Sequence, residues 1–135
     1  MGEAAITQIR KRDGQVVGFD ITKISSAITK AMLAVGGQEG SIEADSPRIA
    51  QSVLMDLEAK ANGAEGYIPH IEDIQNLVER NLILASLPKT AKEYIIYRHQ
   101  RAQIRQQEKN VPERVRKLVD ESKKYFRNPL GEFVY

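Results

Sequence analysis

The side chains best suited to chemistry in this sequence are cations placed where a turn or a helix start would fix them. Lys11 and Arg12 stand directly before Asp13-Gly14, and Lys23 falls at the beginning of an apolar helical pattern. Ammonium and guanidinium groups donate charge-assisted hydrogen bonds to phosphate oxygens. These residues therefore predict a site for a polyanion such as a nucleotide phosphate. The alternative is a solvated turn that carries ordinary surface charges.

A nucleotide site in this chain would have to be built mainly from side chains. The sequence contains neither a Walker A pattern nor a GxGxxG loop. Lys23 in a first helical turn opposes the helix dipole, and a bound phosphate would offset that repulsion. Arg101 is the fourth candidate cation. Gln75 is a candidate for hydrogen bonding to a base or sugar, with an exposed amide as the alternative interpretation.

Three arginines share one face of a late helical segment. Arg98, Arg101 and Arg105 repeat at i, i+3 and i+7. This face allows three interpretations: a solvated stripe, a contribution of one arginine to an anion site, or contact with a nucleic-acid backbone. The last needs a larger basic patch than this one, so nucleic acid is not an expected partner.

Catalysis finds little support in the sequence. No nucleophile motif surrounds any serine, and the lack of cysteine excludes disulfides, thiolate metal sites and cysteine nucleophiles within this chain. We interpret Glu72, Asp73 and Glu79 as a solvated helix face. His70 is expected to cap a helix or lie on the surface, and His99 is expected to face solvent. The chain alone is therefore not expected to be an enzyme.

Length and composition fit one ordinary globular domain. The chain has 135 residues, of which 41% are hydrophobic and 28% charged, with a net charge of +2. That length allows a real core, and the small positive excess does not require a nucleic-acid partner. No apolar run approaches the length of a membrane span and no signal peptide is recognisable, so we expect no membrane association and a cytoplasmic location.

The first part of the chain predicts a hairpin followed by a helix. Residues 6–19 are rich in β-branched and apolar types around Asp13-Gly14, a strong hairpin signal. Asp20 is placed to cap a helix over residues 21–35. Residues 67–68 form a short extended piece before Pro69 that would add a third strand.

The remaining patterns predict three more helices and a linker. Ser46-Pro47 is typical of an N-cap followed by proline at the first helical position, with that helix running to about residue 60. Helices over 70–85 and 88–107 follow, and the inward positions of the second are Ala91, Tyr94, Ile95 and Arg98. The expected fold is α+β: a small β-hairpin or three-stranded sheet as a lid on a four-helix bundle, plus a C-terminal linker helix after Pro112.

Three groups of residues carry a resemblance to a known family. They are residues 9–14 (IRKRDG) with Phe19-Asp20 and Lys23-Ile24, residues 71–75 (IEDIQ) with Val78-Glu79, and residues 91–98 (AKEYIIYR) with Arg101. In this order and spacing, over about residues 6–105, they resemble the ATP-cone domain. The resemblance implies a four-helix bundle covered by a small sheet, with ATP or dATP bound between the two as an allosteric effector.

The resemblance also implies roles for the cations. Carried over by position, Lys11 and Arg12 would contact the phosphates and help to close the hairpin over the nucleotide. Lys23 and Arg101 would complete the phosphate site. No metal ligand from a side chain is implied; Mg²⁺ would accompany the triphosphate, held mainly by phosphate oxygens.

The nucleoside end of the site follows from the same resemblance. Ile9 would lie against the adenine with its backbone near the base, and Gln75 would approach the nucleoside. Asp20 would cap the first helix near the ribose or base. These assignments complete an expected binding set of Ile9, Lys11, Arg12, Asp20, Lys23, Gln75 and Arg101.

The C-terminal residues sharpen the expected context. Residues 119–135 resemble the segment that joins an ATP-cone to the catalytic barrel of a ribonucleotide reductase, most closely the adenosylcobalamin-dependent class. We therefore expect an ATP-cone over residues 1–107, and a linker helix with the start of the catalytic domain over 108–135. The expected function is to switch overall reductase activity, through a homo-oligomer that changes state.

Two alternatives remain at this point. One is the ATP-cone of a nucleotide-responsive repressor of reductase genes, which needs four metal-binding cysteines that this chain lacks. The other is a degenerate structural module that binds no nucleotide.

Overall fold

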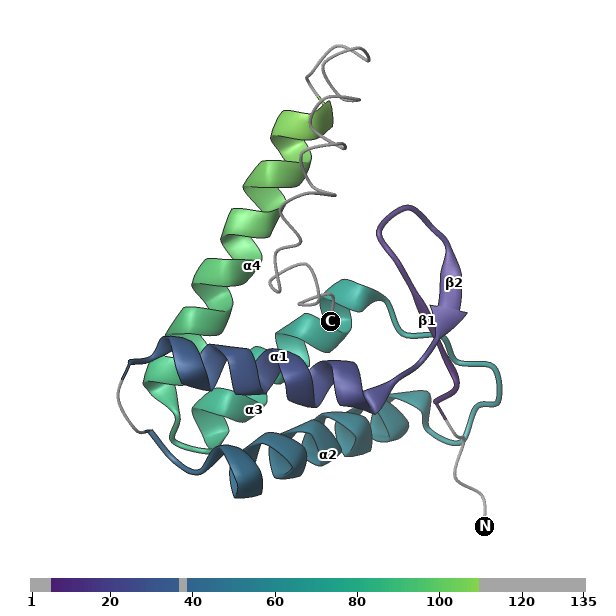
Figure 1. Cartoon of the computed structure of the whole chain (residues 1–135). Helices are drawn as coiled ribbons and strands as arrows, with labels where there is room; N and C mark the ends of the chain where they lie inside the picture. The colour runs from purple at the N-terminus through teal and green to yellow at the C-terminus, as the bar shows by residue number, and fades with distance from the viewer. Residues whose placement is uncertain (1–5, 37–38, 110–135) are drawn as a thin grey trace.

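A hairpin and four helices make up the described part of this chain. The computed structural model describes residues 6–36 and 39–109. In chain order the elements are β1 (Gln8–Arg10), β2 (Val16–Gly18), α1 (Ile21–Ala34), α2 (Ile42–Ala61), α3 (Ile71–Leu84) and α4 (Pro88–Lys109). Figure 1 shows the hairpin at one end of α1, and α4 extending beyond the other helices. The predicted α+β class is confirmed.

The hairpin forms around the predicted Asp-Gly turn. β1 and β2 pair antiparallel, with Ile9 opposite Val17. The carbonyl of Lys11 accepts from the Gly14 amide at 3.0 Å, and the Lys11 amide donates to the Gln15 carbonyl at 2.8 Å. Gly14 has φ +89°, a left-handed conformation that glycine adopts without steric cost. A tight three-residue loop therefore brings Arg12 to the tip of the hairpin.

The hairpin is tied to the segment before α3 by its backbone. The Arg10 amide donates to the Pro69 carbonyl at 2.9 Å, and Arg10 forms an isolated parallel bridge with His70. The sheet of the described residues has two strands, so the predicted third strand at 67–68 is absent and only this bridge takes its place. Pro69 has no N–H with which to continue a ladder.

The predicted start of the second helix is wrong. α2 begins at Ile42 with Ser41 as N-cap, and Pro47 lies inside the helix. Ser46 is buried instead of capping: its hydroxyl donates to the Ser25 carbonyl at 2.7 Å and shares a hydrogen bond with Thr29 at 2.8 Å. The sequence pattern at Ser46-Pro47 fits a cap, but tertiary contact with α1 recruits this serine for the helix interface.

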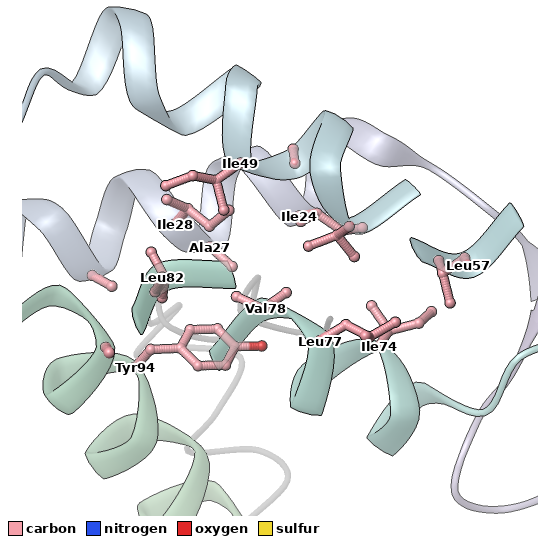
Figure 2. Close-up of a cluster of buried hydrophobic side chains, with 14 of the residues drawn as sticks. Ile24, Ala27, Ile28, Ile49, Leu57, Ile74, Leu77, Val78, Leu82 and Tyr94 are labelled. Atoms are coloured by element: carbon pink, nitrogen blue, oxygen red, sulfur yellow. The ribbon is translucent and has the colours of Figure 1, made fainter. Parts of the chain in front are cut away.

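The core lies between the four helices, each of which packs against two of the others. α1 contacts α2 and α4, and α3 contacts the same two helices. Figure 2 shows the side chains that meet there from all four helices, among them Ile28, Ile49, Val78 and Tyr94. Ile9 reaches the same core from β1 and is fully enclosed. The hairpin is therefore anchored through its inner face.

The inward face of α4 is narrower than predicted. Ala91 and Tyr94 are buried as expected, and Arg98 is partly buried. Ile95 is 42% exposed, so its predicted inward position is wrong. Neighbouring residues on a helix point about 100° apart, and the surface that α4 shares with α1 and α3 accommodates the Tyr94 ring but not its neighbour.

The beginnings of α3 and α4 are capped by side chains. His70 is the N-cap of α3, where Nδ1 accepts from the Glu72 amide at 3.1 Å, so the predicted capping role is confirmed. Glu39, in the loop before α2, accepts from the amides of Lys89 at 3.0 Å and Thr90 at 2.8 Å. This carboxylate fixes the start of α4 from a distant part of the sequence.

The structure leaves the predicted C-terminal linker untested. The predicted linker helix and the segment resembling the approach to a catalytic barrel lie outside the described residues, as does most of the 108–135 region. Within the described ranges, no helix combines the length and apolarity needed to cross a bilayer.

Truncation of Ile74 tests the core. Ile74 is fully enclosed, so we expect Ile74→Ala to reduce the free energy of unfolding by about 2–5 kcal/mol. Ile83→Ala on the same helix is the matched control, because that side chain is 58% exposed and should change stability by no more than about 0.5 kcal/mol. Urea denaturation measures both, and equal losses would contradict the placement of the core.

The Glu39 cap predicts a pH-dependent contribution to stability. Burial raises the pKa of Glu39, but hydrogen bonds from the Thr90 and Lys89 amides outweigh burial, and the net pKa is lowered. A lowered carboxyl pKa stabilises the fold above the unfolded value, near 4.3, and this contribution is lost as pH falls through the folded value.

We therefore expect Glu39→Gln to reduce the free energy of unfolding by about 1 kcal/mol at pH 7. The gap between wild type and variant should close below about pH 4, where wild-type Glu39 becomes protonated and resembles glutamine. Urea titrations at a series of pH values measure this gap. A gap that is constant with pH would contradict a charged cap.

Candidate functional site

Arg12 connects the tip of the hairpin with α3. Its Nη2 donates to Oε1 of Gln75 at 2.8 Å, and its Nε lies 3.8 Å from Oε1 of Glu72. The Arg12 side chain is 28% exposed, whereas Gln75 is buried. The turn therefore directs this cation down onto the helices, and two of the predicted binding residues, Arg12 and Gln75, are in direct contact.

Positively charged side chains of α4 act on Arg12. The pKa of Arg12 is lowered, first by burial and then by the positive charge of Arg105. The pKa of Arg105 is also lowered, first by burial and then by Arg101. The nearby Glu72 carboxylate opposes both shifts. We call Arg12, Arg101 and Arg105 the arginine cluster. Arg12 comes from the tip of the hairpin, and the other two come from the distal half of α4.

Arg98 serves a different purpose from the rest of the arginine face. Its Nη1 donates to Oδ1 of Asn76 at 2.7 Å and to Oε1 of Glu79 at 2.9 Å. The side chains of this ion pair are only 23% and 22% exposed. Arg98 therefore binds α4 to α3 and neutralises Glu79, which was interpreted from sequence as part of a solvated face.

Two tyrosines of α4 are influenced by these arginines. Burial is the main cause that raises the pKa of Tyr94, against the lowering effect of Arg98 and Arg12. Burial likewise raises the pKa of Tyr97, against Arg101 and Arg105. Both phenols therefore stay neutral at physiological pH, so neither neutralises a neighbouring arginine.

The start of α1 holds a second pair of predicted site residues. Asp20 is the N-cap, and its Oδ1 accepts from the Thr22 amide at 3.0 Å and from the Thr22 hydroxyl at 2.6 Å. These bonds lower the pKa of Asp20, the side-chain bond most, and Lys23 lowers it further. The predicted cap is confirmed, with an exposed Lys23 beside it in the first turn.

Ile9 and Lys11 have well-defined places in the hairpin. Ile9 is fully enclosed, backbone as well as side chain, so in this conformation it offers no surface to a ligand. Lys11 is half-buried, and its amide and carbonyl both close the turn. The assignments of Ile9 to adenine and of Lys11 to phosphate stay predictions.

Sequence reasoning missed two members of this site. Glu72 was interpreted as a solvated acid, although it lies three residues before Gln75 and therefore on the same helix face. Arg105 was placed on the arginine face, with its three open interpretations, but was not named as a site residue, although it follows Arg101 by one helical turn. In both cases the helical spacing from a predicted site residue is the signal that points to the role.

Comparison with known proteins agrees with this geometry. A family model described as the ATP cone domain matches residues 7–103. A vitamin B12-dependent ribonucleoside-diphosphate reductase of Mycobacterium tuberculosis (strain CDC 1551 / Oshkosh) is 37% identical over 105 residues, which cover 78% of this chain and 14% of that protein. The chain belongs to the ATP-cone domain family, and the resemblance stated from sequence is confirmed.

Other relatives come from different organisms and reductase types. A vitamin B12-dependent ribonucleoside-diphosphate reductase of Thermoplasma acidophilum is 38% identical over 107 residues, covering 76% of this chain and 13% of that protein. An anaerobic ribonucleoside-triphosphate reductase of Haemophilus influenzae is 31% identical over 112 residues, covering 83% of this chain and 15% of that protein. The chain thus spans between 13% and 15% of the length of these relatives.

The Arg98–Glu79 contact predicts measurable coupling between α3 and α4. A double-mutant cycle with Arg98→Gln and Glu79→Gln should give a coupling free energy of about 1 kcal/mol, because the pair is largely shielded from solvent. The control cycle uses Arg48→Gln and Asp45→Gln on α2, where Arg48 is 58% exposed and the expected coupling is about 0.3–0.5 kcal/mol. Urea denaturation of the variants measures both coupling free energies. A coupling of zero between Arg98 and Glu79 would contradict the role of this ion pair in holding α4 to α3.

Proposed function

We propose that this chain is the nucleotide-sensing domain of a ribonucleotide reductase, which binds ATP or dATP as an allosteric effector between the hairpin and helices α3 and α4. The observation that carries the proposal is the arginine cluster, in which Arg12 of the hairpin and Arg105 of α4 share the Glu72 carboxylate of α3, with Arg101 one helical turn before Arg105. Partly desolvated cations in such excess favour a polyvalent anion. Membership of the ATP-cone family implies nucleotide binding and supports an adenine nucleotide as that anion.

The proposed site divides into a phosphate end and a nucleoside end. Lys11, Arg12, Lys23 and Arg101 would bind phosphate oxygens. Gln75 and Asp20 would contact the nucleoside, and the backbone of Ile9 would do so after a shift of the hairpin that uncovers it. Mg²⁺ would accompany the triphosphate, with phosphate oxygens as its principal ligands. The residues of this chain bind and orient the effector and carry out no catalytic step.

Regulation requires that the two nucleotides stabilise different arrangements. An effector shifts a conformational equilibrium only by its difference in affinity for the two states. ATP would favour an active arrangement and dATP an inhibited one that differs in oligomeric state. Residues 1–107 would form the sensor, and 108–135 would lead into the catalytic domain. The names of the relatives, all of them reductases, support this context.

Calorimetric titration with ATP and dATP in the presence of Mg²⁺ tests the proposal directly. We expect saturable binding of both nucleotides. If neither gives heat and neither raises the melting temperature, the domain is a structural module and the proposal is wrong.

Removal of the two hairpin cations tests the assignment of the phosphate site. Lys11→Ala combined with Arg12→Ala should weaken binding of both nucleotides by more than about tenfold, since each charge-assisted hydrogen bond contributes roughly 1.5–3 kcal/mol. Arg48→Ala is the control for loss of an exposed arginine on α2. Circular dichroism establishes that the variants fold. Unchanged dATP affinity in a folded double variant would contradict the assignment.

A further inference from the structure

Glu72 and Arg105 extend the nucleotide site beyond its predicted residues. We propose that the Glu72 carboxylate is an internal competitor of the phosphate, which lowers nucleotide affinity by neutralising Arg12, and that Arg105 is an additional phosphate-binding residue. This inference rests on the proposed function, because it concerns the affinity of that same site for a polyphosphate.

The position of Glu72 supports competition. Its Oε1 lies 3.8 Å from the Arg12 Nε, a distance that allows Coulombic attraction but is too long for a good hydrogen bond. Arg12 already donates from Nη2 to Gln75, so Gln75 holds the guanidinium in place while Glu72 supplies charge. Glu72 is itself 56% exposed and can turn into solvent at little cost. A phosphate that binds Arg12 must displace this carboxylate or bind against its repulsion.

Arg105 lies within the same electrostatic environment. It shares one face of α4 with Arg98 and Arg101, and its positive charge, like that of Arg98, lowers the pKa of Arg12. Arg98 is neutralised by Glu79, but the carboxylates that act on Arg105 are Glu72, already shared with Arg12, and Glu108 on its own helix. Three cations with two nearby carboxylates keep a net positive charge.

The elements that carry these residues lie on one side of the molecule. In Figure 1 the hairpin and the distal half of α4 both rise to the same side of α1 and α2. Arg12 extends from the hairpin towards α3, and Arg101 and Arg105 extend from α4. A triphosphate carries several negative charges and forms bidentate hydrogen bonds with arginine, so it would outcompete a single carboxylate for this cluster.

Calorimetry on single variants separates the two roles. With ATP and with inorganic tripolyphosphate as titrants, Glu72→Gln should tighten binding by about threefold, the size expected for removal of a partly exposed opposing charge. Arg105→Gln should weaken binding of both by about tenfold, the size of one charge-assisted hydrogen bond. Arg105→Lys, which retains the charge, should restore part of the loss.

The matched controls are Glu43→Gln and Arg48→Gln. Both residues are exposed on the N-terminal half of α2, and neither change should alter affinity. A folded Glu72→Gln variant that binds tripolyphosphate no more tightly than wild type would overturn the competitor role. Wild-type affinity in Arg105→Gln would overturn the phosphate-binding role. If wild type binds neither titrant, the proposed function itself is wrong, and this result is distinct from the other two.

Discussion

The attachment of the hairpin to the helical bundle is the constraint on which the site depends. A two-stranded hairpin is marginally stable by itself, so it needs a surface to pack on. Ile9 supplies that contact from its inner face, and the Arg10–Pro69 backbone hydrogen bond sets its position along the chain entering α3. With these two contacts in place, the short loop closed by Gly14 directs the Arg12 side chain towards α3.

The arginines of α4 differ in whether a carboxylate neutralises them. Arg98 and Glu79 are both shielded from solvent, and a charge shielded from solvent needs a partner of opposite sign. This ion pair therefore links α4 to α3. The arginine cluster has no such one-to-one pairing: Glu72 is shared between cations from two elements. The same helix face of α4 thus carries a structural arginine and two to which the proposed function assigns an external anion. Sequence spacing alone does not distinguish between them.

Local signals predicted much of the fold, and long-range contacts account for what they missed. Asp20 and the Asp13-Gly14 turn depend on neighbouring residues, and both predictions are confirmed. Ser41 and Ser46 are equally good caps by residue type, and the choice between them depends on the contact of Ser46 with α1. The bond from Glu39 to the amides of α4 joins residues far apart in sequence, which no local pattern reveals.

The candidate site was predicted only as far as residue types and family resemblance allow. Arg12 and Gln75 are in contact, and Arg101 belongs to the same cluster, but Glu72 was left out of the predicted site although its spacing from Gln75 places the two on one helix face. Its environment depends on where the hairpin lies, and that depends on the core contact of Ile9. Burial and partner choice are properties of the packed structure, so they had to come from it.

The anchoring of α4 has a mechanical consequence. Glu39 holds its first turn and Arg98 holds its middle, whereas Arg101 and Arg105 lie on the part that extends beyond the other helices (Figure 1). With a rise of about 1.5 Å per residue, Lys109 is some 16 Å beyond Arg98, and a tilt of about 10° at Arg98 would swing it by about 3 Å. The position of Arg101 and Arg105 is therefore sensitive to small changes in the direction of α4 at the Arg98–Glu79 ion pair.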